Sequence, residues 1–258
     1  MNFIWLWRAN VVVAFLLAAQ AVGLSVTSDF NQGIKPVSAG FITKDPLASS
    51  SAGHSVFAEA SHHLFDIGVG YLVIAFLLIG AVMHLFACWR YRKMYEADIK
   101  QGLNKSRWVG YAFSANLVVL TVALLAGVYD YATLLAMIVF TAAASLLAML
   151  AEANRGVKGG VSRFCAALAL LAGIVPWVII GLYIWSSITY GDGLPTFVYW
   201  LSGSIAALVA LMGLNTYMLY RKSGRWADYA FAEMGYIVLG FVIKTALAWQ
   251  VFASVIKK

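Results

Sequence analysis

The sequence predicts an all-α integral membrane protein whose seven helices form one domain over residues 1–258. Hydrophobic residues make up 62% of the chain and charged residues only 11%, whereas a soluble domain carries roughly a quarter charged residues. So few charges cannot cover a surface that faces water, and we expect lipid to cover much of it. Seven apolar stretches are each long enough to cross the bilayer, which takes about 20 residues per helix.

The apolar stretches cover residues 3–26, 63–89, 107–128, 131–152, 162–189, 195–220 and 227–256. None alternates with a period of two over its length, which argues against a membrane barrel. Lipid offers the backbone no hydrogen-bond partners, so apolar spans of this length favour helices. The first stretch has an alternative as a cleavable signal peptide, since Arg8 precedes an apolar run. Trp5 and Trp7 resemble an interfacial anchor and favour a retained helix.

The longest loop, about residues 27–62, joins the first two spans. It contains Pro36, Pro46, several glycines and a run of serines at 49–51. That composition favours turns and a short hairpin over a helix. A loop of this length is often functional or serves assembly.

Loop charges predict the orientation in the membrane. The loops on the N-terminal side contain Arg90, Arg92, Lys93, Lys100, Lys105, Arg107, Arg155, Lys158, Arg163, Arg221, Lys222 and Arg225. The opposite short loops, around Asp130 and Asp192, contain no Lys or Arg. The positive-inside rule therefore predicts a multi-pass protein of the cell membrane with a cytoplasmic N-terminus and an outer C-terminus. The same loops account for the net charge of +7 without a nucleic-acid partner.

Lys244 stands in the last apolar stretch, 12 residues before its end at Ile256. That is roughly 18 Å along a helix, too far for the side chain to reach the interface. A charged lysine near the bilayer centre costs on the order of 3 kcal/mol or more. Burial favours the neutral amine, which is the form that attacks an aldehyde. Position alone leaves three interpretations open: a lysine bonded to hydroxyls or carbonyls, a charge in a channel or transporter, and a Schiff base.

The residues around Lys244 resemble the seventh helix of heliorhodopsins. The similar runs are Tyr236–Leu239 and Lys244–Phe252, and just upstream Gly224–Tyr229 with Glu233 match the family's Gly-x-Trp-x-Asp-Tyr and Glu. The run Arg107–Asn116 is similar to the family's Arg-Trp-x-Glu-Tyr-x-x-Ser-Ala in the third helix. Parts of the first two helices are similar as well, and the family shares the inverted orientation derived from charge.

The resemblance implies a light-sensing membrane protein, neither a pump nor an enzyme, that binds retinal on Lys244 as a Schiff base. Tyr111, Ser114 and Ala115 would line the polyene, Thr141 would approach it from the fourth helix, and Gly240 would face the imine. Ordinary helix packing is the alternative role for Tyr111 and Ser114. The resemblance further implies a homodimer and a signalling partner that the sequence does not identify. An opsin scaffold that binds no retinal and modulates a partner is a further alternative.

The sequence departs from the family where the charge of the imine would be balanced. Gly110 replaces the counterion glutamate, Gly240 fills a second position where microbial rhodopsins can place a carboxylate, and Leu17 replaces a histidine. Without a nearby anion, a poorly solvating site disfavours a protonated imine. We therefore expect a neutral imine that absorbs in the ultraviolet. The alternative is that the imine stays protonated and positively charged. Its charge would then be balanced by a displaced carboxylate, or by chloride or water in the space left by Gly110.

Other polar residues carry weaker indications. His84 remains in the second helix, where it either relays a proton or is a buried, hydrogen-bonded histidine. Glu152, Arg155, Asp228 and Glu233 are expected to form a polar network that holds helix ends at the inner face. The histidines of the long loop fit no zinc pattern. Cys88 and Cys165 predict neither a disulfide framework nor a metal site.

Overall fold

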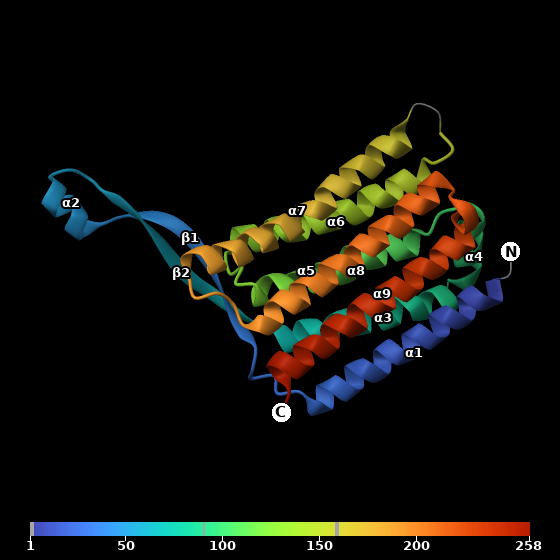
Figure 1. Ribbon diagram of the computed structural model, residues 1–258, viewed down its shortest axis with the longest axis horizontal. Helices are drawn as coiled ribbons and strands as arrows, with labels where there is room; N and C mark the ends of the chain where they lie inside the picture. The colour runs from blue at the N-terminus through green and yellow to red at the C-terminus, as the bar shows by residue number, and fades with distance from the viewer. Residues whose placement is uncertain (1–2, 90, 158–159) are drawn as a thin grey trace.

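The computed structural model describes residues 3–89, 91–157 and 160–258. Within them, seven helices are long and apolar enough to cross a membrane, which confirms the predicted spans. They are α1 (Phe3–Thr27), α3 (Val69–Cys88), α5 (Lys105–Leu125), α6 (Tyr131–Ala153), α7 (Val161–Tyr190), α8 (Thr196–Arg221) and α9 (Tyr229–Val251), the last continued by a π-helical turn, η2 (Phe252–Ile256). The helices lie side by side in one bundle, with the two chain ends at opposite ends of it (Figure 1).

The loop between the first two spans is a long β-ribbon. Strands β1 (Ile34–Lys44) and β2 (Phe57–Gly68) pair antiparallel, and a short helix, α2 (Pro46–Ala52), forms the tip. The ribbon projects beyond the end of the bundle at which the C-terminus lies (Figure 1). The prediction of a short hairpin was therefore wrong in length, and the second span begins at Val69 rather than at residue 63. The apolar residues before Val69 pair with β1: Phe65, for example, lies opposite Val37.

Backbone hydrogen bonds join the ribbon and the C-terminus to the bundle. The Ser38 amide of β1 donates to the Tyr129 carbonyl, 3.0 Å away, in the turn between α5 and α6. A β-bulge between Val37 and Ser38 interrupts the strand pairing at this contact. The Asp29 amide donates to the Ile256 carbonyl at 2.7 Å, so the end of the last span is tied to the segment that leaves α1.

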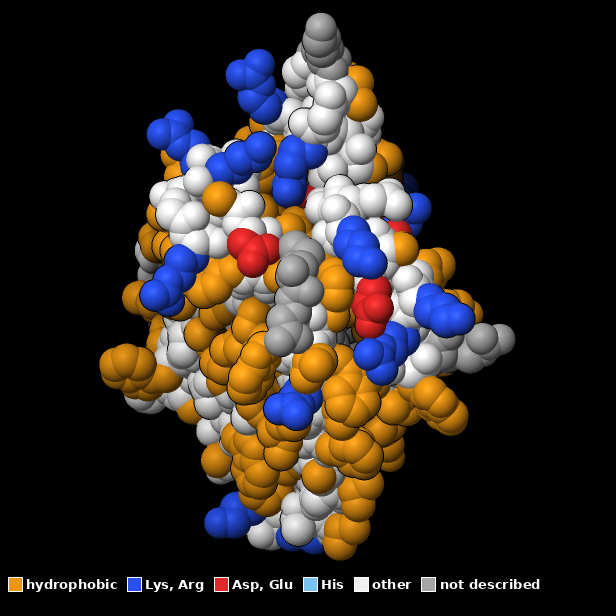
Figure 2. All heavy atoms as spheres, turned by 90° about the vertical axis from the view of Figure 1, so that its right-hand side faces the viewer, with side chains coloured by type: hydrophobic (Ala, Val, Ile, Leu, Met, Phe, Trp, Pro, Cys, Tyr) orange, Lys and Arg blue, Asp and Glu red, His pale blue; other side chains and the backbone are white. Residues whose placement is uncertain are grey.

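The opposite end of the bundle carries the loops that the sequence analysis identified as basic. The chain crosses it through α4 (Arg92–Lys100), which the sequence had not predicted, and a 3₁₀ turn, η1 (Gly224–Ala227), precedes α9. Lys and Arg side chains are spread over this end of the molecule (Figure 2). Arg90 and Lys158 of the predicted basic set lie outside the described residues. All the basic loops therefore meet the N-terminus at one end, as the charge pattern requires.

Arg107 differs from the other basic residues, because it is buried and not a loop charge. Its Nη2 lies 2.6 Å from Oε1 of Glu152 in α6, and its Nη1 donates to Glu233 in α9. Glu152 also accepts from the Trp108 indole at 2.7 Å, and Glu233 accepts from the Asn104 amide at 2.7 Å. This set, the Arg107 cluster, joins α5, α6 and α9 at the end of the bundle where α1 begins and satisfies both carboxylates.

The expected inner network is thus present for Glu152 and Glu233, with Arg107 at its centre. Arg155 reaches Glu152 at 3.8 Å. Asp228 has a different role, because its carboxylate caps α9 by accepting from the Ala230 amide at 3.0 Å.

Loss of the cap at α6 is predicted to destabilise the bundle. The Asp130 carboxylate accepts from the Thr133 amide and hydroxyl, both at 2.7 Å, so Asp130→Ala should cost about 0.5–2 kcal/mol of unfolding free energy. These hydrogen bonds hold the pKa of Asp130 below its usual value of 3.8. The contribution is therefore complete above pH 3.8 and is lost as pH falls through the lower folded value. Thermal unfolding in detergent at several pH values measures it.

Asp45→Ala is the matched control, because Asp45 caps α2 at the ribbon tip through the Ala48 amide. It should leave the unfolding of the bundle unchanged. An equal loss in both variants would mean that the α6 cap has no special role.

Removing Arg107 should be far more damaging. In Arg107→Ala two buried carboxylates lose their cation, which costs about 3–5 kcal/mol. Arg92→Ala removes the exposed pair with Glu96 on α4 and should change the unfolding free energy by less than about 1 kcal/mol. Chemical unfolding of the two purified variants compares these costs, and similar losses would contradict the role assigned to the cluster.

Candidate functional site

Lys244 lies in the middle of α9 with 6% of its surface exposed. No ion pair among the described residues includes it, so no carboxylate there stands within 4.0 Å of its amine. Its Nζ lies over the ring of Tyr111, 5.5 Å from the centroid. The amine is therefore surrounded by protein and lacks the partner that a buried cation requires.

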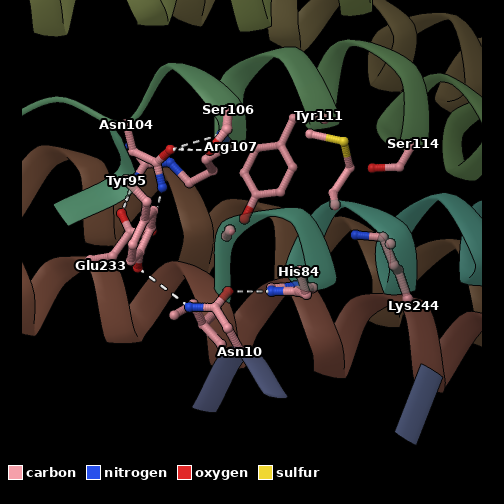
Figure 3. Close-up of a pocket in the computed structure, with 15 residues that line it drawn as sticks. Asn10, His84, Tyr95, Asn104, Ser106, Arg107, Tyr111, Ser114, Glu233 and Lys244 are labelled. Carbon is pink, nitrogen blue, oxygen red and sulfur yellow. Dashed lines mark hydrogen bonds and ion pairs between the residues drawn. The ribbon is translucent and has the colours of Figure 1, made fainter. Parts of the chain in front are cut away.

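The amine borders a cavity of about 40 Å³. Figure 3 draws its 15 lining residues, which come from α1, α3, α4, α5, α9 and the turn before α5. Lys244 and Ser114 lie at one end, and Asn104, Arg107 and Glu233 lie at the other (Figure 3). The cavity thus extends from the amine toward the Arg107 cluster, and its volume suits a few water molecules.

Gly80 of α3 makes room for the lysine stem. A Cβ built on Gly80 would lie 3.1 Å from Cδ of Lys244 and 2.9 Å from Cδ1 of Leu17. Both distances are too short for a relaxed contact, so any side chain at position 80 would displace the lysine or the leucine. Leu17 of α1 is fully buried and closes the other side of this notch with hydrocarbon.

Gly110, where the family places its counterion, is covered by Met83 of α3. A Cβ at Gly110 would lie 3.0 Å from both Cγ and Cε of Met83. Gly110 still lines the cavity, but the space directly over its Cα is filled by the thioether side chain. The space left by Gly110, which the alternative interpretation assigned to chloride or water, is therefore filled on this side.

Gly240 faces Tyr111 rather than the amine. A Cβ at Gly240 would lie 3.1 Å from the Tyr111 hydroxyl oxygen. That hydroxyl donates to the Tyr236 carbonyl, 3.1 Å away, which fixes the ring beneath the Lys244 amine. Gly240 is one helical turn before Lys244, as expected, but it does not line the cavity.

The other predicted residues divide between the cavity and its surroundings. Ser114 lines the cavity and is buried. Ala115 and Thr141 do not line it. Thr141 is buried in α6, where its hydroxyl donates to the Met137 carbonyl at 2.8 Å. The structure therefore brings Lys244, Tyr111, Ser114, Gly110 and His84 to one cavity and leaves Ala115, Thr141 and Gly240 outside it.

His84 begins a polar chain toward the inner end of the bundle. Its Nδ1 lies 2.7 Å from Oδ1 of Asn10, whose amide nitrogen donates to the Leu6 carbonyl at 2.8 Å. The Asn10 oxygen therefore accepts, and His84 Nδ1 carries the hydrogen. Figure 3 shows the imidazole directed toward Asn10. His84 is therefore a half-buried histidine that is hydrogen-bonded to a side chain of α1.

Tyr95 of α4 continues this chain to the Arg107 cluster. The Asn10 amide lies 3.4 Å from the Tyr95 hydroxyl, which lies 3.5 Å from the Glu233 carboxylate. Burial, and then the nearby Glu233 carboxylate, raises the pKa of Tyr95. The phenol therefore stays protonated at physiological pH and remains a hydrogen-bond donor.

Among the residues of the site that escaped the sequence analysis are Gly80, Met83 and Tyr95. Nothing local marks Gly80 or Met83, because their importance comes from side chains on other helices. Tyr95 lies in α4, a short helix rich in charged residues. Because of these charges, the segment was interpreted as a loop, and its two buried residues, Tyr95 and Ile99, were not recognised.

The chain is similar to known proteins at two levels. A structure of a light-driven proton pump, LR (Mac), from Leptosphaeria maculans has a TM-score of 0.57 at 13% identity, over 95% of this chain and 92% of that one. At this identity the likeness shows the seven-helix rhodopsin fold alone. No functionally curated protein matches. The family model described as heliorhodopsin matches residues 6–256. Because that match covers nearly the whole sequence, the chain belongs to the heliorhodopsin family.

Proposed function

We propose that the protein is a light sensor that carries retinal on Lys244 as a Schiff base and does not pump ions. Membership of a rhodopsin family implies the chromophore, and the observation that carries the proposal is the buried amine of Lys244 without a carboxylate partner. Condensation with an aldehyde would remove the need for such a partner, because a neutral imine bears no charge.

The residues around the amine fit the attachment of retinal. The stem is held in the Gly80 notch, and the amine faces the aromatic ring of Tyr111. The cavity of about 40 Å³ is smaller than the roughly 300–1,000 Å³ of ordinary ligand pockets. Binding would therefore require side chains to move. When bound, retinal supplies light absorption and a change of double-bond geometry.

The separation of charges supports a neutral, ultraviolet-absorbing imine. Glu233, the carboxylate that lines the same cavity, stands 11 residues before Lys244 in α9, or about 16 Å along the helix axis. At an effective dielectric of about 20, a unit charge at that distance contributes about 1 kcal/mol, against about 4 kcal/mol at 4 Å. Glu233 is moreover already bound by Arg107 and Asn104.

The same geometry argues against a proton pump, because a pump needs a nearby carboxylate to accept the proton of the imine. The chain's own residues instead favour a signal that is carried by movement of a helix. Lys244 and Glu233 belong to one helix, so a displacement of Lys244 would be transmitted along α9 and would strain the Arg107 cluster at the inner end. A signal would leave from that end, whose basic loops we assign to the cytoplasm. A homodimer and a signalling partner remain expectations from the family.

Adding all-trans retinal to the purified protein tests the attachment. We expect a mass increase on the Lys244 peptide after borohydride reduction, and an absorption band in the ultraviolet at pH 7. Lys244→Ala should give neither, whereas the exposed control Lys222→Ala should behave like the parent. A visible maximum at neutral pH without added halide would contradict the neutral imine. No adduct on Lys244 would overturn the function and leave the channel, transporter or scaffold interpretations.

The Gly80 notch gives a second, independent test. Gly80→Leu should push the Lys244 stem aside and reduce retinal incorporation by at least about tenfold, since a misplacement of 1 Å can cost about 100-fold. Gly203→Leu on α8 is the control, because a Cβ there meets nothing within 4 Å. Equal incorporation in both variants, measured by the yield of reduced adduct, would show that the notch does not position the lysine.

A further inference from the structure

The side chain of Met83 covers Gly110 in the cavity that Lys244 also lines. Met83 and Gly110 line the same cavity as Lys244. Three atoms of Met83, Cβ, Cγ and Cε, lie within 3.5 Å of the position that a Cβ of residue 110 would take. The volume that a larger residue would fill from α5 is thus filled from α3 by an uncharged thioether.

Met83 and the lysine notch share one face of α3. Gly80 and Met83 are three residues apart, and residues at this spacing are neighbours on a helix surface. Gly80 touches the lysine stem and Met83 covers Gly110. One stretch of α3 therefore both contacts the stem of Lys244 and fills the place over Gly110.

The cavity offers Lys244 no free carboxylate in place of the one that is missing at Gly110. The titratable and charged residues that line the cavity with Lys244 are His84 from α3, Tyr95 from α4, Arg107 and Tyr111 from α5, and Glu233 from α9. From α1 the cavity receives Asn10, which is uncharged. Glu233 is bound by Arg107 and Asn104 at the far end of the cavity. The place over Gly110 is therefore a position on α5 from which an anion could enter the cavity that Lys244 lines.

We infer that Met83 controls the protonation of the Schiff base by occupying the place over Gly110 and keeping a halide or a carboxylate out of it. The inference rests on the proposed attachment of retinal to Lys244. A thioether accepts hydrogen bonds weakly, so it excludes anions and water without stabilising a positive charge. Met83 is a positioning residue here, since it acts by excluding another group.

Four retinal-loaded proteins test this inference: the parent, Met83→Ala, Gly110→Glu, and the double variant Met83→Ala with Gly110→Glu. Chloride titration at pH 7 should convert the ultraviolet band of Met83→Ala to a visible band and leave the parent unchanged. In the double variant, the pH at which half of the pigment is visible should lie about three units above that of the parent. Gly110→Glu alone should shift less, because Met83 competes for the same space.

Three further variants separate the effect of the volume of residue 83 from the effect of its charge and from the loss of a methionine. Met83→Leu retains an apolar side chain of similar size and should keep the parent's ultraviolet band in chloride. Met83→Glu places an acid in the same volume from α3 and should give a visible band without any change at position 110. Met212→Ala, on α8 and outside the cavity lining, is the control for the loss of a methionine.

The inference is overturned if Met83→Ala ignores chloride and the double variant titrates like Gly110→Glu alone. Should Met83→Ala not fold, the spectrum of Met83→Glu decides, and an unchanged ultraviolet band there overturns the inference. These outcomes differ from failure of the proposed function, in which the parent itself forms no borohydride-stable adduct on Lys244.

Discussion

The structure depends on a primary amine that is buried in a membrane-spanning helix without a carboxylate beside it. Lys244 is 6% exposed and takes part in no ion pair among the described residues. A cation in such a place costs several kcal/mol. The lysine stem is packed in the Gly80 notch, its amine lies over the face of the Tyr111 ring, and Ser114 and His84 line the same cavity. The ring face offers a positive nitrogen a weak attraction, but no carboxylate among the described residues pairs with it, and this is the ground on which we propose a neutral nitrogen.

The contrast with the Arg107 cluster shows that the fold is able to pair buried charges. Arg107 binds Glu152 and Glu233, and each carboxylate has further donors. This network pairs both buried carboxylates at the N-terminal end of the bundle, where it joins three helices. Because α9 carries both Glu233 and Lys244, a single rigid helix connects a fully paired region with an unpaired one. A movement of Lys244 can therefore be transmitted along α9 to Glu233 and the rest of the Arg107 cluster.

Sequence alone could predict whatever follows from a run of neighbouring residues. The spans, the buried lysine and the basic end required only hydropathy, length and charge. The ribbon was underestimated because Leu64 and Phe65 look like the start of an apolar span, while both lie in β2, where Phe65 pairs with Val37 of β1. Gly80 and Met83 were missed for another reason: their roles depend on Lys244, Leu17 and Gly110, which lie on other helices. Gly110 was recognised as unusual, but what fills the place beside it was not visible in the sequence.

Gly110 and Met83 illustrate how a family's fold can persist while its electrostatics change. A missing glutamate by itself would leave a hole, and a hole beside a polar cavity would admit water or an anion. Here Met83 reaches within 3.0 Å of the place that a side chain at position 110 would occupy, so volume is restored and charge is not. Restoring the acid without shortening Met83 would overpack the site, which itself destabilises a core. Family membership therefore establishes the helices and implies the chromophore, whereas the protonation state, in our proposal, depends on the packing of these two residues.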